Sequence, residues 1–283
     1  MASQKEGLGV LSDVRLTGQW REYYLPYLRR PQVEALLRSG VKVAVVPVGS
    51  IEQHAEHLPL GTDYYGVEEV CKAAAEEHPF IIVPAMMVGV SHHHLGFAGS
   101  VTVSPETLAR TLVEVGESLS AHGFRHYVMV NGHGGNSGAV TTAESRLNDG
   151  GRVNAVAFPS MNQFYTMFLQ EFAAYFDSHS GVEETSRALH AFPELVAMEF
   201  ARAPELKLSE DQLDAIKNRD SDPDRYRELL TPLPPLDEIS DTGALSLLDI
   251  GKEANAELGR RNFERFVAGL IELVKRLEGE NQE

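Results

Sequence analysis

Acidic residues and histidines gather in three short segments of the chain, residues 49–63, 131–136 and 179–186. The candidate ligands in these segments are three carboxylates and two imidazoles: Glu52, His54, Asp63, His133 and Glu184. The single cysteine, Cys71, lies outside the segments, so the set offers oxygen and nitrogen but no sulfur. Such a set suits Zn²⁺, Mn²⁺ or Fe²⁺ better than Ca²⁺ or Cu⁺. The pattern therefore predicts a metal centre.

Five protein ligands would crowd one catalytic cation, which must keep an open coordination position. They divide more readily between two divalent cations that share a carboxylate. The four positive charges of two cations exceed the three negative charges of the carboxylates by one, which suits one bound hydroxide. A metal lowers the pKa of bound water to about 7 in favourable cases, so this nucleophile is available near neutral pH. Gly132, Gly134 and Gly135 let the backbone approach closely and supply N–H groups for an oxyanion.

The first two segments each follow a run that is typical of a buried strand, residues 41–48 and 127–130. Short β-branched runs alternate with longer amphipathic stretches, which favours a βαβ series and a mainly parallel sheet. Open α/β sheets build their sites in loops at the carboxyl ends of such strands. The other elements expected are helices at 30–39, 64–77 with Thr62 as the cap, 104–122, 137–147, 162–175 and 251–277, and strands within 80–90 and 152–158.

After the third segment the chain changes in character. Residues 209–230 are charged and prone to form helix, and residues 231–235 read Thr-Pro-Leu-Pro-Pro, which is a rigid extended segment. We predict that residues 203–246 form an excursion over the edge of the sheet or over the site. We expect residues 1–283 to form a single domain in which residues 1–12 are flexible.

The composition restricts the possible partners. The chain has 283 residues, with 25 basic and 41 acidic side chains and a formal charge of −16. Nucleic acid and anionic membrane surfaces are therefore poor partners, because they would repel the protein. A polar N-terminus without an apolar core is no secretory signal, and no apolar run reaches the roughly 20 residues that span a bilayer. We expect a cytoplasmic protein that acts on a small molecule.

Three ordered motifs resemble those of the creatininase (creatinine amidohydrolase) family. They are Glu52-Gln53-His54 followed by His57-Leu58-Pro59 and Thr62-Asp63, then Asn131-Gly132-His133-Gly134-Gly135-Asn136, then His179-Ser180-Gly181 before Glu184-Thr185-Ser186. The turn at residues 97–100 and the segment at residues 251–253 also resemble parts of the family, so the resemblance spans about residues 40–270. It implies a three-layer α/β/α fold, a dinuclear metal centre and assembly into homohexamers.

The resemblance also implies roles for single residues. Glu52, Asp63 and His133 would hold one cation, and His54, Asp63 and Glu184 the other. His179 matches the histidine to which the family assigns proton transfer. Its ordinary pKa near 6.5 suits a group that takes and returns a proton at cellular pH.

Two positions depart from true creatininases. Gly135 stands where they have a glutamate, two residues after the histidine of the second motif, and Tyr175 stands where they have a tryptophan. The first difference removes a carboxylate from one metal site, and water or substrate could occupy the gap. We therefore predict that the substrate is an amide other than creatinine.

Other residues are expected to support the site or contact the substrate. Among the three consecutive histidines at 92–94, His94 is nearest to the glycine turn and is predicted to line the pocket. His57 is predicted to support the ligands, and Asp177 could orient His179. The predicted function is metal-dependent hydrolysis of a cyclic or linear non-peptide amide. Two alternatives are cleavage of a C–C bond in a cyclic diketone by the same centre, and a non-catalytic metal-binding subunit.

Overall fold

A four-stranded parallel sheet forms the centre of the computed structural model, which describes residues 18–151, 153–158, 177–218, 224–225 and 234–279. Its strands run in the order β2-β1-β3-β4, and are β1 (Val43–Val48), β2 (Ile81–Ile82), β3 (His126–Asn131) and β4 (Asn154–Phe158). Every residue of β1 and β3 is buried. Both faces of the sheet are therefore covered, as the continuous apolar runs predict.

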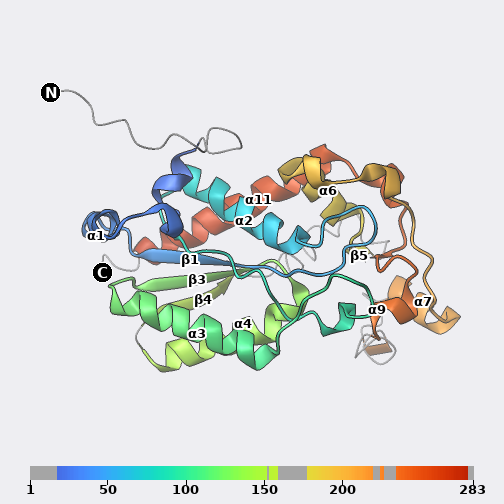
Figure 1. Cartoon of the computed structure of the whole chain (residues 1–283), viewed down its shortest axis with the longest axis horizontal. Coiled ribbons are helices and arrows are strands. Elements are labelled where there is room, and N and C mark those ends of the chain that lie inside the picture. Colours follow the sequence, from blue (N-terminus) through green and yellow to red (C-terminus); the bar gives the residue numbers. More distant parts are fainter. Residues whose placement is uncertain (1–17, 152, 159–176, 219–223, 226–233, 280–283) are drawn as a thin grey trace.

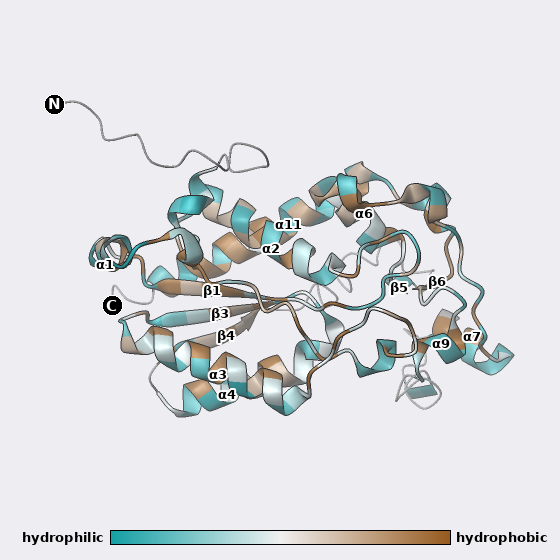
Figure 2. Cartoon of the chain, viewed as in Figure 1, coloured by the Kyte–Doolittle hydropathy of each residue, from teal (hydrophilic) through white to brown (hydrophobic). Residues whose placement is uncertain are grey.

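Helices cover the two faces of the sheet (Figure 1). Side chains alternate between the faces along β1: Val43 and Val45 pack with α2 (Thr62–Glu77) and α11 (Ala256–Gly279), whereas Ala44 and Val46 pack with the opposite layer. That opposite layer is α3 (Pro105–Ala121) and α4 (Ser137–Asp149). Strand β1 is mostly hydrophobic, and the outer helices mix hydrophobic with hydrophilic residues (Figure 2). The predicted three-layer α/β/α fold is confirmed.

The remaining elements lie around the two ends of the sheet (Figure 1). The helices and strands are α1 (Arg30–Arg38), β5 (Asp177–His179), α6 (Val182–Ala191), α7 (Glu210–Lys217), α9 (Leu236–Ile239), β6 (Leu245–Ser246) and α10 (Ile250–Glu253). The short 3₁₀ turns are η1 (Gln19–Glu22), η2 (Leu25–Tyr27), η3 (His92–His94), η4 (Gly134–Asn136), η5 (Pro193–Leu195) and η6 (Met198–Phe200). In the described part of the excursion at 203–246, β6 pairs antiparallel with β5, which carries the third motif. None of the helices described is long and apolar enough to cross a membrane.

Several predicted boundaries need correction. The helix expected at 64–77 begins at Thr62 with Gly61 as its N-cap, and the Thr62 hydroxyl donates to the Pro59 carbonyl at 2.7 Å instead of capping. The long helix expected at 251–277 is two helices, because Ala254 is extended (ψ 133°). Only Ile81–Ile82 of the region 80–90 forms a strand of the sheet. The Ser104 cap is confirmed, since its hydroxyl accepts the Thr107 N–H at 3.2 Å. Residues 1–12, the helix expected at 162–175 and Tyr175 lie outside the described residues.

Candidate metal centre

The loop after β1 carries the first candidate ligands into the interior. Glu52 and His54 have no exposed surface, and Asp63 is 3% exposed. The Glu52 N–H donates to the Leu60 carbonyl at 2.9 Å, which closes the loop on itself. Asp63 lies in the first turn of α2, where the N-terminal end of a helix favours a carboxylate. One loop and the helix after it therefore supply three buried donors.

The loop after β3 brings His133 beside the first loop. The Gly132 N–H donates to the Val48 carbonyl at 2.8 Å, which ties the end of β3 to the end of β1. The His133 N–H donates to the Asn131 side chain at 3.1 Å. Asn136 donates from Nδ2 to the Gly49 carbonyl at 3.0 Å and accepts the Val90 N–H at 2.9 Å. These contacts between neighbouring strand ends fix the position of the His133 backbone.

The third motif crosses from β5 into α6. Ser180 has a left-handed backbone (φ 50°), and its N–H donates to Glu184 at 2.6 Å, which orients that carboxylate. Asp177 accepts the Val182 and Glu183 N–H groups at 2.8 and 3.0 Å. The prediction that Asp177 orients His179 is therefore wrong, because its two oxygens serve the N-terminus of α6.

All five predicted ligands converge. His133 places Nδ1 3.1 Å from Asp63 Oδ2 and Nε2 3.1 Å from Glu52 Oε2. His54 Nε2 lies 3.4 Å from Asp63 Oδ1 and 3.8 Å from Glu184 Oε2. Asp63 thus stands between the two imidazoles with one oxygen toward each. This is the arrangement expected of a carboxylate shared by two cations.

Donor atoms gather within 4.8 Å of one another in three groups: Glu52 with Asp63 and His133, His54 with His179 and Glu184, and Glu52 with His94 and His179. The first group equals one predicted ligand set. The second has His179 where the prediction has Asp63, although Asp63 Oδ1 also approaches His54. The third was not predicted.

Three buried side-chain atoms that could bind a metal have no hydrogen-bond partner in the described part of the chain, so these residues fit a cation. Glu52 Oε1, His54 Nε2 and Asp63 Oδ2 are buried and have no hydrogen-bond partner among the described residues. A buried polar atom without a partner costs about 1–3 kcal/mol, and more when it is charged. Three such atoms at one point would be expensive in an ordinary core. Coordination to a divalent cation would satisfy all three.

Without a cation, protons balance the charge. Burial alone would lower the pKa of His54, but Asp63, Glu184 and Glu52 around it raise that pKa to about 9. Burial likewise opposes protonation of His133, yet Glu52 and Asp63 hold its pKa well above the usual range. Burial raises the pKa of Glu184 to about 7. The metal-free centre therefore holds protons on the atoms that would bind a cation.

A second set of histidines is neutral. Burial, followed by repulsion from His54, lowers the pKa of His179 to about 3. Burial and the neighbouring imidazoles also lower the pKa of His94. His57 has a pKa lowered to about 4 by burial, and its Nε2 lies 2.8 Å from the Thr185 hydroxyl, so it joins the first loop to α6.

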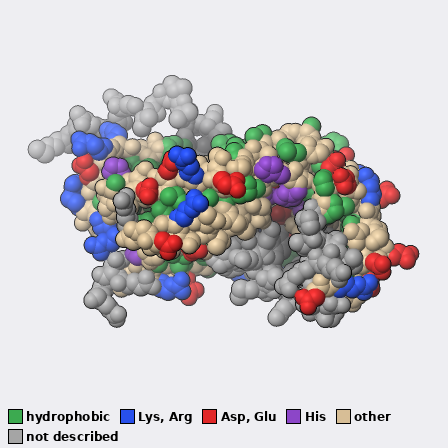
Figure 3. Space-filling model, turned by 90° about the horizontal axis from the view of Figure 1, so that it is seen from below, with side chains coloured by type: hydrophobic (Ala, Val, Ile, Leu, Met, Phe, Trp, Pro, Cys, Tyr) green, Lys and Arg blue, Asp and Glu red, His purple; other side chains and the backbone are tan. Residues whose placement is uncertain are grey.

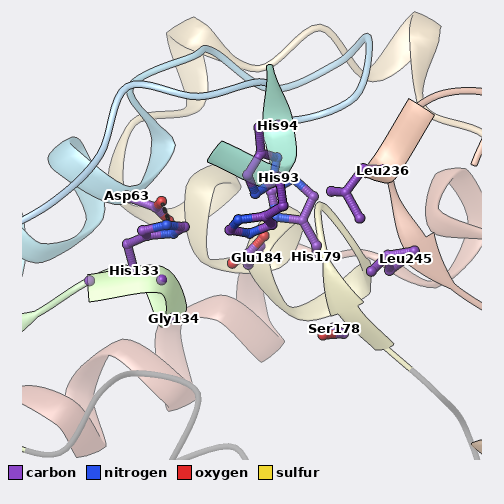
Figure 4. A pocket seen from close by; sticks show the side chains of 12 residues that line it. Asp63, His93, His94, His133, Gly134, Ser178, His179, Glu184, Leu236 and Leu245 are labelled. Carbon is purple, nitrogen blue, oxygen red and sulfur yellow. Dashed lines mark ion pairs between the residues drawn. The ribbon is translucent and has the colours of Figure 1, made fainter. Parts of the chain in front are cut away.

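The donors open on a pocket of about 350 Å³ with two unlike walls (Figure 4). Imidazoles and carboxylates form one wall, and Leu236 and Leu245 from the excursion form the other. Gly134 and Gly135 also line the pocket. Seen from below, a group of histidine side chains lies toward the half of the molecule that carries β5 and α9 (Figure 3).

Several residues at the site were not predicted. Ser91 donates to Glu52 Oε2 at 2.6 Å, and Gln53 contacts two histidine rings. His93 lines the pocket beside the predicted His94 and stacks on His133 with ring centroids 5.9 Å apart. Consecutive histidines carried the only signal for His93. Nothing in the sequence marks the two leucines, because their place depends on the path of the excursion.

Gly135 fits tightly in its position. A Cβ atom there would collide with the Val90 carbonyl oxygen and with Nε2 of His133. The position that holds a glutamate in true creatininases therefore has no space for a side chain unless both the Val90 carbonyl and His133 move.

Comparison with known proteins identifies the family that the three motifs resemble. The creatininase family model, described as creatinine amidohydrolase, matches residues 26–274. The mycofactocin precursor peptide peptidase of Mycobacterium tuberculosis is 37% identical over 169 residues, which is 56% of this chain and 62% of that relative. The creatinine amidohydrolase of Pseudomonas putida is 27% identical over 199 residues, or 64% of this chain and 72% of the relative.

Solved structures share the fold. Creatinine amidohydrolase (creatininase) superposes with a TM-score of 0.71 at 23% identity, covering 90% of this chain and 97% of the other. A putative creatinine amidohydrolase from Bacteroides fragilis superposes with a TM-score of 0.71 at 22% identity, covering 91% and 97%. The match to the family model extends over most of the chain and includes all three motifs. The chain belongs to the creatininase family.

Proposed function

We propose that this protein is a metal-dependent hydrolase that cleaves an amide C–N bond. Two divalent cations would be held by the five converging side chains: Glu52, His54, Asp63, His133 and Glu184. The observation that supports this most directly is the set of three buried donor atoms without hydrogen-bond partners among the described residues. A cation between these atoms would stabilise them by replacing the water that they lose on burial.

A bound divalent cation supplies a Lewis acid that polarises a carbonyl and lowers the pKa of water. The chain itself would do the rest. His179 has a neutral ring that lines the pocket, and we propose that it carries a proton to the leaving nitrogen. The backbone at Gly134 and Gly135 lines the same space, where N–H groups would hold the developing oxyanion. Leu236 and Leu245 would exclude water from the opposite side.

The relatives widen the proposed range of substrates. Four of them are described as peptidases of the mycofactocin precursor peptide, and one as creatinine amidohydrolase. We therefore propose an amide in a short peptide or in a small molecule, a wider class than the non-peptide amides predicted from the sequence. The 3-dehydro-scyllo-inosose hydrolase of Thermotoga maritima is 32% identical over 91 residues. A match to a hydrolase with this name keeps the cyclic diketone as a second candidate.

The metal content per chain is the first test. Protein purified without a histidine tag is expected to contain about two equivalents of divalent metal by mass spectrometry, in line with the shared carboxylate. A mutant creatininase has been solved in a Zn-Zn type and creatininase in a Mn form, so Zn²⁺ and Mn²⁺ are the cations to restore first. The protein is then treated with a chelator to remove metal, and a part of it is reloaded with Zn²⁺ or Mn²⁺. Both forms are assayed on short peptides, formamides, creatinine and cyclic diketones.

A matched variant separates metal loss from general damage. Glu68→Gln alters another buried carboxylate on α2, outside the donor groups, and should keep both metals. Hydrolysis that disappears with chelator and returns with Zn²⁺ or Mn²⁺ supports the proposal. A wild-type chain that takes up neither Zn²⁺ nor Mn²⁺ would contradict the proposed function. It would favour a non-catalytic subunit only if binding to another protein were then found.

A further inference from the structure

The side-chain amide of Gln53 contacts both neutral histidines of the pocket. Gln53 is 4% exposed and lies between Glu52 and His54 in the chain. Its Oε1 accepts the Ala55 N–H at 3.0 Å. Its Nε2 lies 3.2 Å from the Gly243 carbonyl, 3.0 Å from His94 Nδ1 and 3.1 Å from His179 Nε2. The amide orientation is therefore fixed, because Oε1 faces a backbone donor and Nε2 faces a backbone acceptor.

The proton on His179 follows from these contacts. His179 Nε2 also lies 2.9 Å from the Gln53 backbone carbonyl, which can only accept a hydrogen bond. Nε2 of His179 must therefore carry a proton and donate it to that carbonyl. It cannot also accept from the Gln53 amide. Nδ1, the other ring nitrogen, is 3.9 Å from Glu52 Oε1 and faces the donor cluster.

The contacts of Gln53 also determine which nitrogen of His94 carries the proton. An amide nitrogen has two N–H groups, and Gly243 takes one of them. Since His179 cannot accept the other, it goes to His94 Nδ1. His94 Nδ1 is then unprotonated, so the neutral ring carries its proton on Nε2. Nε2 of His94 lies 3.1 Å from Glu52 Oε1 without forming a hydrogen bond to it.

We propose that Gln53 is a positioning residue that fixes the tautomers of both rings. It keeps the His94 proton on Nε2, which bars that nitrogen from binding a cation, and through its backbone carbonyl it holds the His179 proton on Nε2. This assignment rests on the proposed metal-dependent function. It also decides among the three donor groups, because the group of Glu52, His94 and His179 cannot then hold a cation through both imidazoles.

The surrounding backbone is shaped around this amide. Ala55 has a left-handed conformation (φ 56°) that a non-glycine residue keeps only when its surroundings impose it, and its N–H is held by Gln53. Gly243 is also left-handed (φ 84°), and a Cβ there would collide with the Gln53 amide. The Ser240 hydroxyl accepts the Gly243 N–H at 3.0 Å and fixes that turn. The excursion at 203–246 therefore reaches the site through Gln53.

The direct test reads the ring nitrogens of the metal-free full chain. Histidine-specific ¹⁵N labelling distinguishes a protonated from an unprotonated ring nitrogen by chemical shift, and the His94→Gln variant assigns the His94 signals. We expect an unprotonated Nδ1 and a protonated Nε2 on His94. For His179 we expect a protonated Nε2. A proton on Nδ1 of His94 in the wild-type chain would overturn the proposal.

Two substitutions test the cause. In Gln53→Glu the amide becomes a carboxylate that only accepts, so His94 should gain a proton on Nδ1. In Gln53→Met the amide is lost, so His94 should show a mixture of tautomers, while His179 keeps its proton on Nε2 through the Gln53 backbone. An unchanged His94 pattern in both variants would show that another group sets the tautomer.

Metal affinity gives a second readout. The Gln53 amide also holds the loop that carries Glu52 and His54, because its Oε1 accepts the Ala55 N–H. Loss of a group that supports metal ligands typically weakens metal binding by about 10–100-fold, and we expect Gln53→Met to weaken Zn²⁺ binding within this range. Asn262→Leu removes another buried side-chain amide, on α11, and should leave Zn²⁺ affinity unchanged at a similar loss of thermal stability. Equal Zn²⁺ affinity of Gln53→Met and wild type would contradict the positioning role.

The outcomes separate the two proposals. A wild-type chain that binds no Zn²⁺ but shows the expected tautomers contradicts the proposed function and leaves the assignment of protons intact. A chain that binds Zn²⁺ but carries the His94 proton on Nδ1 keeps the function and overturns the role of Gln53.

Discussion

Helix α2 carries two buried carboxylates with opposite surroundings. Glu68, 6% exposed, meets the Tyr24 and Tyr64 hydroxyls at 3.4 and 3.2 Å and the Lys72 ammonium at 3.0 Å. Asp63, 3% exposed, meets only imidazoles at 3.1 and 3.4 Å, and its Oδ2 has no hydrogen-bond partner among the described residues. The two lie on the same helix within the same protein interior.

The difference separates a structural cluster from a binding site. A buried charge is tolerated when hydrogen bonds and an opposite charge surround it, as they surround Glu68. In the part of the chain that the structure describes, Asp63 forms no ion pair with a lysine or arginine, and protonated His54 and His133 stand in for a cation. Protons can leave when a metal arrives, whereas the Lys72 ammonium stays.

The largest expected effect comes from the shared carboxylate. Asp63→Asn removes a charge from both predicted metal sets, so it should weaken metal binding by more than about 100-fold, beyond the usual cost of losing a residue that only orients a ligand. Metal content and amide hydrolysis measure this directly. The matched Glu68→Gln variant should keep its metal. Equal metal loss in both variants would show that Asp63 and Glu68 do not differ in their role in metal binding.

The pH dependence of metal binding comes next. His54 and His133 have raised pKa values in the metal-free protein, so both hold protons at pH 7 and must release them when Zn²⁺ binds. Affinity should therefore fall as pH falls, by about 100-fold per pH unit if two protons leave. Calorimetry in buffers of different ionisation enthalpy counts these protons. Zn²⁺ binding without proton release would show that neither histidine holds a proton in the metal-free protein.

A smaller effect is expected at Gly135. Because a Cβ there collides with the Val90 carbonyl and the His133 ring, Gly135→Ala should move His133 and weaken Zn²⁺ binding by about 10-fold. Gly138→Ala on α4 is the control, since nothing lies within 4 Å of a Cβ at that position. Unchanged affinity in Gly135→Ala would mean that the loop shifts without moving His133.

Substitutions among Glu68 and its contacts Tyr24, Tyr64 and Lys72 (the Glu68 cluster) should change the stability of the protein and not its metal binding. Glu68→Gln removes the charge that faces Lys72 and should lower the free energy of unfolding by about 1–3 kcal/mol. Glu69→Gln also loses a 3.0 Å contact with Lys72, but the Glu69 side chain is 33% exposed, so a smaller loss is expected. Denaturant unfolding of the metal-free variants compares them. Equal stability of Glu68→Gln and wild type would show that the cluster contributes little.

The smallest effect concerns Cys71, on the same helix. The thiol is fully buried in the core between α2 and the sheet, and burial raises its pKa. It should react slowly with a thiol reagent in the native protein and completely in denaturant. Fast native reaction would show that α2 opens, and would weaken the contrast between a closed core and an open site.

The sequence predicted those parts of the site that depend on local order. Buried strands appear as apolar runs, and the ligands at 52, 54, 63 and 133 follow them directly, so their meeting at one sheet edge follows from parallel topology. Family motifs then predicted Glu184 from a distant segment. The start of α2 at Thr62 was missed, because a helix end depends on contacts such as that of the Thr62 hydroxyl with Pro59.

Tertiary structure alone decided the surroundings of the ligands. Asp177 looked like a partner of His179, but the turn into α6 brings two N–H groups to its oxygens. Ser91, Leu236 and Gly243 reach the site from segments that carry no ligand motif. Local periodicity records which face of an element is buried, but it does not record which loop lies over that face. The ligand types were thus readable from the sequence, whereas their protons, their partners and the opposite wall of the pocket arise only when distant segments pack together.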